Sequence, residues 1–433
     1  MQITILHHGL SIQFDTYTND YPRQINVKWY RDSTLLYNVD FTVDSANYFC
    51  DQQVEAYNKV VITIVKMTKT NRFLKIFNIA DGIIREFGNS ELKNVEIIEQ
   101  IATEELPINE ATLDIIPFNN TGVMFQRTLP MEIYRDDVLY GKFFINSSTS
   151  NYDKTAYKVK IDDYINVLDG QKYVGGLYAD ITVSDLIAEI MGDIPYEIET
   201  NTIGDLAITG YLPIMTRREA LQQVAFITNA LVDCSRNDKV YISSLPTTSS
   251  QTITKDKILS IETTQENIVT QMVLQTTLLA TKGASADNLF SAKLNGTTTV
   301  IFDQPTFNLS ITNGTIVESN INYAVISGTG QTVTLTGKTY QQSVKQDSKS
   351  NSYVVTTDIE KTETYQTTLT CSSPILDQLQ FVESKIKAKF KMGTVKVGDM
   401  ITLNGVTCRV KTLDYEIDQT NIYCSAELEA YYE

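Results

Sequence analysis

The chain has 433 residues, of which 42% are hydrophobic and 20% are charged, and its formal net charge is −16. This composition is typical of globular domains, and the length allows about two to four of them. An acidic chain without a basic block lacks the clustered cations that duplex DNA requires, so we expect no specific nucleic-acid binding. No stretch reaches the roughly 18 apolar residues of a membrane span, and the first residues do not have the pattern of a secretory signal.

Residues 1–70 are predicted to form an accessory, sandwich-like β module. Apolar and polar residues alternate in 25–29 and in 39–43, which is the period of strands with one buried face. The alternation restarts at Arg72, and short polar turns separate at least five further strands. Residues 71–172 are therefore predicted to form a first β-barrel or sandwich.

The pattern becomes helical in residues 173–245. Thr182 is a predicted N-cap, and Gly192 a predicted stop, for the helix between them. Thr216 and Glu219 fit a capping box, which indicates a second helix over 216–231. Strand patterns at 231–234 and 239–242 follow, so this segment is predicted to be a small α/β domain.

Residues 246–433 begin with a Thr- and Ser-rich stretch and stay polar as far as residue 370. Short strands are expected at 300–302 and 333–335. A last helix is expected from Pro374 to Phe390, because apolar residues recur there at helical spacing. Further strands complete the chain, so the predicted fold class is mainly β (α+β).

A search for catalytic groups finds little. Histidines, the commonest general bases, number only two, His7 and His8, and neighbouring residues of a strand point to opposite faces. Every cysteine follows them in the chain, against the usual order of cysteine hydrolases, and no GxSxG elbow occurs. Zinc-ligand spacing and a glycine-rich phosphate loop are also missing. We therefore predict no catalytic, cofactor-binding or metal-binding residues and no enzymatic activity.

Three pairs of adjacent acids remain for glycoside hydrolysis, which needs only two carboxylates. These pairs are Glu104–Glu105, Asp136–Asp137 and Asp162–Asp163. Each falls at an expected turn between strands. Adjacent acids at turns are usually solvated, and this interpretation is favoured over a catalytic one.

Aromatic residues of the first module have two interpretations. Trp29 and Tyr30, with Tyr17 and Tyr21, could form a platform on which sugars stack. The favoured interpretation is ordinary strand packing, since tyrosine is a good strand residue.

The five cysteines are odd in number, widely spaced and without a CxxC motif. This usage predicts free thiols buried in strands. Cys408 and Cys424 flank an expected hairpin, so a disulfide between them is the alternative.

Three stretches resemble the baseplate hub proteins of contractile phage tails and R-type bacteriocins (tailocins), especially those of clostridial-type Gram-positive bacteria. They are 71–99, with NRFLKI at 71–76 and LKNVEIIE at 92–99; 210–226, with GYLPI at 210–214 and TRREALQQVAF at 216–226; and VGD at 397–399. The first module, with VKWY at 27–30, is similar to an accessory sandwich of clostridial relatives.

The resemblance implies a homotrimer in which each chain supplies two tail-tube-like barrels, 71–172 and 246–433, separated by the α/β domain 173–245. Such a trimer matches the hexameric tail tube protein, holds the threefold spike or needle tip protein and anchors baseplate wedge proteins. The tape-measure protein is a further candidate partner. The family has no hub active site, and its particles are assembled in the bacterial cytoplasm and released by lysis. The alternatives are a tail-tip receptor- or cell-wall-binding protein and a wall hydrolase with unrecognised carboxylates.

Overall fold

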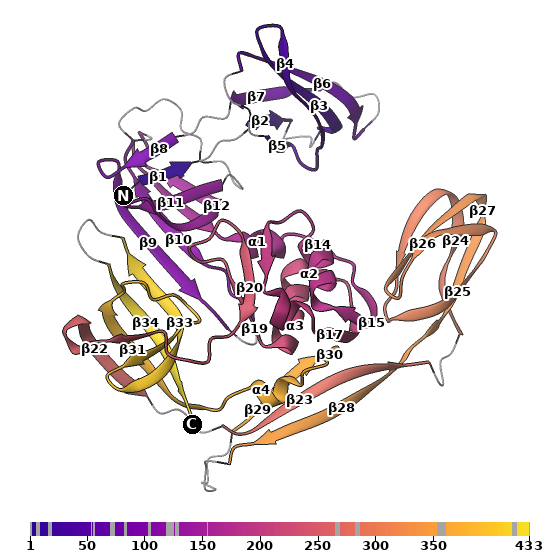
Figure 1. Ribbon diagram of the computed structural model, residues 1–433. Helices are drawn as coiled ribbons and strands as arrows, with labels where there is room; N and C mark the ends of the chain where they lie inside the picture. The colour runs from indigo at the N-terminus through magenta and orange to yellow at the C-terminus, as the bar shows by residue number, and fades with distance from the viewer. Residues whose placement is uncertain are drawn as a thin grey trace. The chain divides into compact units, whose positions relative to one another are not determined.

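The computed structural model describes all residues except 1, 6–8, 16–19, 53, 55–56, 70–73, 82–84, 103–104, 118–124, 126–129, 154, 265–268, 282–285, 353–360, 418–421 and 433. The fold is mainly β (Figure 1), as predicted. The chain divides into two compact units. Unit 1 comprises Met1–Lys93, Asp114–Tyr140 and Phe144–Val159, and unit 2 comprises Asn94–Leu113, Gly141–Phe143 and Lys160–Glu433. The chain passes between them within strands β9 (Leu92–Gln100), β10 (Glu110–Ile115), β12 (Val138–Ser150) and β13 (Tyr157–Asp162).

Unit 1 contains the predicted sandwich-like module. One antiparallel sheet has the order β5 (Asn47–Asp51), β2 (Gly9–Phe14), β7 (Ile76–Asp81), and the other has the order β4 (Thr34–Thr42), β3 (Pro22–Arg31), β6 (Lys59–Met67). The alternation at 25–29 buries Ile25, Val27 and Trp29 against Ile12 and Phe14 of the other sheet. The period-2 pattern therefore predicted both the strand and its buried face.

The first strand of the chain does not join this module. Strand β1 (Gln2–Ile5) pairs antiparallel with β8 (Arg85–Gly88) on one side and with β11 (Pro130–Arg135) on the other. The strands of the sandwich-like module thus lie between β1 and β8 in the sequence. Boundaries at 1–70 and 71–172 remain predictions: β1 of the first segment pairs with strands of the second, and β7 of the second segment pairs with β2 of the first.

In unit 2, α1 (Tyr164–Asp169) lies just before the predicted α/β segment 173–245, and α2 (Val183–Met191) and α3 (Arg217–Thr228) lie within it. Thr182 caps α2 by accepting from the Asp185 N–H, and Thr216 and Glu219 form the predicted capping box of α3. Helix α3 ends three residues before the predicted boundary because Asn229 adopts a left-handed conformation (φ 51°). Three small sheets accompany these helices. Their strand orders are β15 (Gly176–Thr182), β17 (Ala207–Leu212), β30 (Leu369–Cys371); β16 (Tyr196–Ile198), β20 (Val240–Ser244), β19 (Ala230–Asp233); and β14 (Lys172–Tyr173), β18 (Met215–Thr216).

The C-terminal strands of unit 2 belong to a larger sheet. They are one end of a 13-stranded sheet, in the order β22 (Ile258–Thr264), β31 (Val382–Lys391), β34 (Tyr423–Tyr431), β33 (Val406–Glu416), β9, with β32 (Met400–Leu403) between β33 and β21 (Gln251–Ile253); from β9 the sheet continues with β10, β13, β12, β11, β1 and β8. The helix predicted from Pro374 to Phe390 is wrong: only α4 (Ile375–Gln378) is helical. From Ser384 onward the apolar residues alternate with lysines, and pairing of both edges of β31 fixes that segment as a strand.

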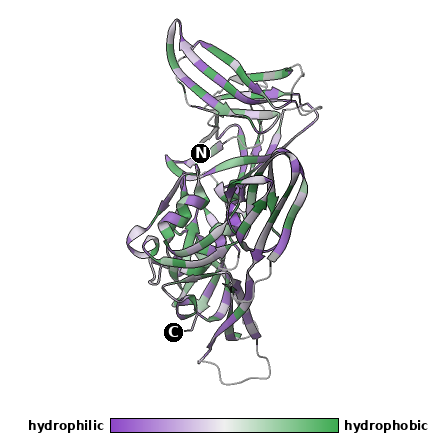
Figure 2. Cartoon of the chain, turned by 90° about the vertical axis from the view of Figure 1, so that its right-hand side faces the viewer, coloured by the Kyte–Doolittle hydropathy of each residue, from purple (hydrophilic) through white to green (hydrophobic). Residues whose placement is uncertain are grey.

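The Thr-rich segment forms two further sheets. Strand β23 (Val269–Ala280) lies between β28 (Gln341–Ser350) and β29 (Lys361–Thr367). A four-stranded sheet lies between β23 and β28 in the sequence and consists of β24 (Ala286–Ile301), β25 (Thr306–Thr312), β26 (Gly314–Ser319) and β27 (Tyr323–Thr339). It has its own apolar core, which includes Val300, Ile326 and Leu335. Figure 2 shows apolar and polar residues alternating along such strands.

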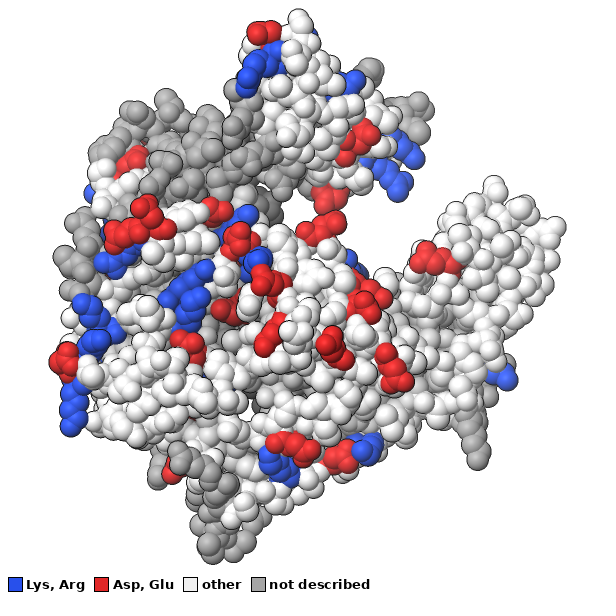
Figure 3. Space-filling view, viewed as in Figure 1, with Lys and Arg blue, Asp and Glu red and all other residues white. Residues whose placement is uncertain are grey.

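We call the segment 286–339 the β24–β27 module. It carries few charges, and on the face shown in Figure 3 it is almost free of charged side chains. Within the described part of the chain, the helices are too short or too polar to span a lipid bilayer.

Candidate functional site

The acidic pair Asp136–Asp137 lies in the tight turn between β11 and β12. Both residues have positive φ angles, 50° and 62°, as a two-residue type I′ hairpin turn requires. Their side chains are exposed, so the solvated interpretation holds for this pair. Glu104 lies outside the described residues, as do His7 and His8, and Glu105 is exposed.

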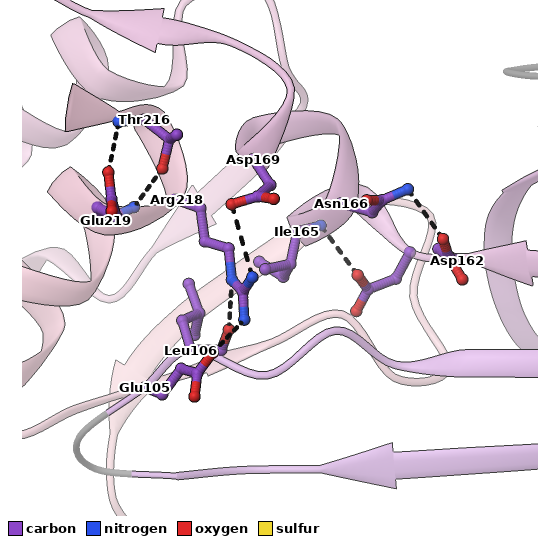
Figure 4. Close-up of polar contacts among 10 residues, drawn as sticks. Glu105, Leu106, Asp162, Ile165, Asn166, Asp169, Thr216, Arg218 and Glu219 are labelled. Carbon is purple, nitrogen blue, oxygen red and sulfur yellow. Dashed lines mark hydrogen bonds and ion pairs between the residues drawn. The ribbon is translucent and has the colours of Figure 1, made fainter. Parts of the chain in front are cut away.

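The pair Asp162–Asp163 is different, because both side chains are buried, with 5% and 1% of their surface exposed. Asp163 is the N-cap of α1: its Oδ1 accepts from the Ile165 N–H at 2.9 Å, and its Oδ2 accepts from the Asn109 N–H at 3.2 Å. Asp162 accepts from the Asn166 amide at 2.9 Å (Figure 4). The prediction of solvated turn acids is therefore wrong here, since a helix start follows the pair and buries it.

Arg218 links α3 to two other segments of unit 2 (Figure 4). Its Nε donates to the Leu106 carbonyl at 2.7 Å, and its two terminal nitrogens lie 3.0 Å from Glu105 and 3.5 Å from Asp169. Glu105 thus serves as the partner of a structural arginine.

The aromatic residues of the first module pack in its core. Trp29 is fully buried and contacts Phe41 edge-on, with ring centroids 6.3 Å apart. A sugar platform built on Trp29 is therefore wrong, and the strand-packing interpretation holds for it. Tyr21 is partly buried against the same core, and Tyr17 lies outside the described residues.

All five cysteines are free thiols, as favoured from the sequence. Cys408 faces Ala430 across the β33–β34 ladder and Cys424 faces Tyr415, so the two cysteines are not opposite each other. Burial raises the pKa of Cys408 and of Cys424 to about 12, which keeps both thiols protonated at neutral pH.

A groove of about 570 Å³ lies within unit 2 between α3, β19, β23, β29 and the ends of β33 and β34. Its described lining includes four basic residues (Lys361, Lys385, Arg409, Lys411) and four acidic ones (Glu105, Glu363, Glu383, Glu429). Several of these charges pair with each other, as Lys361 does with Glu363 and Lys411 with Glu429. In the part of the chain that the structure describes, no group of acidic, Cys or His side chains could hold a metal ion.

A buried ionic cluster in unit 2 was missed by sequence reasoning. Glu99 of β9 lies 3.4 Å from the Arg236 guanidinium and accepts from the Tyr415 hydroxyl of β33 at 2.7 Å. The signal was present, because Glu99 is in phase with Val95 and Ile97, which face the core at period 2. A charged residue on the buried face of a strand indicates a buried partner.

Strand β22 is the outermost strand of the C-terminal sheet, and in the described residues its second edge has no strand partner. Every side chain after Ile258 is exposed, on both faces of the strand. Leu259 and Ile261 are 60% and 38% exposed. This open edge, which we call the β22 edge, is a surface suited to pairing with another strand.

No known protein-family model matches the sequence, and no curated protein matches it either. Solved structures of tail proteins are similar to it at low sequence identity. The 43 kDa tail protein of prophage MuSo2 from Shewanella oneidensis has a TM-score of 0.46 at 7% identity, over 80% of this chain and 96% of its own. A tail protein from Neisseria meningitidis MC58 has a TM-score of 0.48 at 8% identity, over 80% and 94%. Prophage tail protein gp18 from Listeria monocytogenes EGD-e has a TM-score of 0.48 at 8% identity, over 79% and 91%.

Proposed function

We propose that this chain is the structural baseplate hub of a contractile injection particle of the phage-tail or tailocin type, from a clostridial-type Gram-positive host. The hub is a homotrimer that joins the hexameric tail tube to the threefold spike and anchors the baseplate wedges. It catalyses no reaction and uses no cofactor. The sequence stretches at 71–99, 210–226 and 397–399 support this assignment through their resemblance to hub proteins.

The β22 edge is the structural observation that carries the proposal. Among the described residues, the outer edge of β22 pairs with no strand, and its backbone N–H and C=O groups, beside exposed Leu259 and Ile261, form a template for a further strand. In a closed ring of identical chains, such an edge is covered by the neighbouring copy. The obligate interfaces of such rings bury about 2,000 Å² or more.

The rest of the proposal rests on the resemblance of the sequence to hub proteins. Two tube-like barrels in each chain, within 71–172 and 246–433, give a trimer the sixfold repeat that a tube requires. The particle is assembled in the bacterial cytoplasm and released by lysis, and the tape-measure protein is a further candidate partner.

The oligomeric state of the purified full chain tests the proposal. We expect native mass spectrometry to give a trimer, and Ile261→Lys to shift it to monomer, because a charge on the apolar edge opposes strand pairing. The matched control is Val317→Lys, which changes an equally apolar side chain, 61% exposed, on β26. A wild-type chain that stays monomeric at every concentration, or an Ile261→Lys variant as trimeric as the control, would contradict it.

A further inference from the structure

Three elements of unit 2 meet at the buried ionic cluster. Glu99 comes from β9, Tyr415 from β33, and Arg236 from the turn that joins β19 to β20. The Arg236 guanidinium also lies over the Tyr415 ring, 5.9 Å from its centroid, and contacts the Met392 sulfur at 3.7 Å. A sheet strand, its neighbour and the α/β segment are thus joined through polar side chains rather than apolar packing alone.

A second group of buried polar side chains continues this cluster toward α1. Asp233, at the end of β19, accepts from the Ser235 N–H at 2.7 Å. The charge of Asp233 raises the pKa of both Glu99 and Asp163. Asp163 also forms a hydrogen bond with the Cys234 thiol. We call the whole set, Glu99, Asp162, Asp163, Asp233, Arg236 and Tyr415, the acidic joint.

The acidic joint has more acids than bases. Four carboxyl groups are at most 9% exposed; Arg236 contacts Glu99, and Arg236 and Lys396 both lower the pKa of Asp233. The Glu99 Oε2 atom has no hydrogen-bond partner among the described residues. Burial of an ionised carboxylate is unfavourable unless a charge or hydrogen bonds compensate it. Uncompensated members of the joint are therefore more stable when protonated.

We propose that the acidic joint is a pH-sensitive connection between β9, β33 and the α/β segment, tight in mild acid and looser as its buried carboxyl groups ionise with rising pH. The joint holds these elements together while its carboxyl groups carry protons. Ionisation of Asp163 adds a negative charge beside Asp162 and Asp233, so separation of the three elements becomes easier. This inference does not depend on the hub assignment.

The groups that face each carboxyl set the direction of the effect. Burial raises the pKa of Glu99, while Arg236 and the Tyr415 hydroxyl lower it and Asp233 raises it; the Cys424 thiol of β34 is also close. The pKa of Asp163 is raised to about 7, mainly by burial and to a smaller extent by Asp162 and Asp233, against the hydrogen bonds from the Asn109 and Ile165 N–H groups that lower it.

Because the folded pKa of Asp163 exceeds its ordinary value of 3.8, its stabilisation of the joint is complete below that value and is lost as the pH rises to about 7. Above that pH the loss is complete and constant. Glu99, whose pKa is raised in the same direction, adds to the loss.

Hydrogen–deuterium exchange of the full chain between about pH 5 and about pH 7.5, corrected for intrinsic rates, tests this inference. We expect amide protection in 96–100, 230–233 and 412–416 to fall with rising pH, by up to about tenfold per pH unit for one coupled proton. The core strands of the β24–β27 module serve as the internal reference. Protection in the joint that stays constant over this range overturns the proposal, whether or not any variant folds.

Two variants assign the effect to its residues. Glu99→Gln keeps an acceptor for Tyr415, and Asp163→Asn keeps the N-cap acceptor, yet neither new side chain ionises. Together they are expected to reduce the pH slope, and the part that remains comes from Asp233, whose pKa is also raised by burial. Glu427→Gln, which neutralises an exposed carboxylate of β34, is the control and should keep the slope. A slope that is unchanged in the double variant, or that falls equally in the control, rules the inference out.

Discussion

Two regions of unit 2 join separate elements through polar side chains, but with different chemistry. The acidic joint uses ionisable groups, with Glu99 and Arg236 at its centre. The β24–β27 module is instead tied to the α/β segment by neutral amides. Asn322 donates to the carbonyls of Val174 and Leu212, both at 2.8 Å, and Asn320 donates to the Gly175 carbonyl at 3.0 Å.

This difference in chemistry determines whether the strength of each connection depends on pH. We call the hydrogen bonds donated by Asn320 and Asn322 the Asn tether. An amide donor keeps its protons at every pH at which the protein is folded, so the strength of this tether does not depend on pH. A buried carboxyl group changes its charge with pH, so the strength of the acidic joint varies with pH. The Asn tether depends instead on a close approach of the backbone at Gly175 and Leu212. Gly175 has a φ of 62°, and a Cβ atom there would lie 2.1 Å from the Leu212 carbonyl oxygen.

Of the substitutions that distinguish the two connections, removal of Arg236 should lower the free energy of unfolding most. Arg236→Met leaves Glu99 buried without its cation, and we expect a loss of about 3–5 kcal/mol in the free energy of unfolding of unit 2 at neutral pH. The loss should shrink in acid, because a protonated Glu99 needs no counter-charge. Urea unfolding at two pH values measures both quantities, and an equal loss at the two values would contradict the account.

Removal of the Asn322 amide should have an intermediate effect without pH dependence. Asn322→Ala deprives two carbonyl groups of their donor, and we expect a loss of about 2 kcal/mol. Exchange protection near 174–177 should fall equally in acid and at neutral pH. Asn295→Ala, at an exposed position of β24, is the matched control. A marked pH dependence of the Asn322→Ala effect would remove the contrast between the two connections.

The cap of α3 should matter less, because it stabilises one helix rather than a junction. Thr216→Ala removes the acceptor for the Glu219 N–H, and we expect a loss of about 1 kcal/mol, whereas Thr216→Ser should be close to neutral. Thermal unfolding compares the two variants. Equal losses would show that the hydroxyl is not the stabilising group.

The surface ion pair between Lys387 and Glu427 should matter least. Its atoms are 3.3 Å apart, but both side chains are largely exposed to solvent. Lys387→Ala is expected to change the free energy of unfolding by less than about 0.5 kcal/mol at any pH. A loss near that of Arg236→Met would mean that burial does not distinguish the two ion pairs.

Features encoded within a few residues could be predicted from the sequence. Helix α3 was found because Thr216 and Glu219 specify its start locally, and the buried face of β3 followed from its alternation. The segment 382–391 failed for the opposite reason: helical and period-2 patterns overlap there, and the strand partners β22 and β34, distant in the sequence, decide between them.

Buried polar groups were the second failure. Asp136–Asp137 and Asp162–Asp163 look alike in sequence, yet one pair is solvated in a hairpin turn and the other caps a buried helix. The partner of Glu99, Arg236, lies 137 residues away, so no local pattern could identify it. The open β22 edge likewise became visible only with the strand order of the sheet.

Cryo-electron microscopy of particles that contain this chain tests the central claim most directly. The account predicts a ring of three copies at the end of the tail tube, with the β22 edge of each copy covered by a strand of its neighbour. A sixfold or peripheral position of the chain, or a β22 edge that faces solvent in the assembled particle, would contradict it.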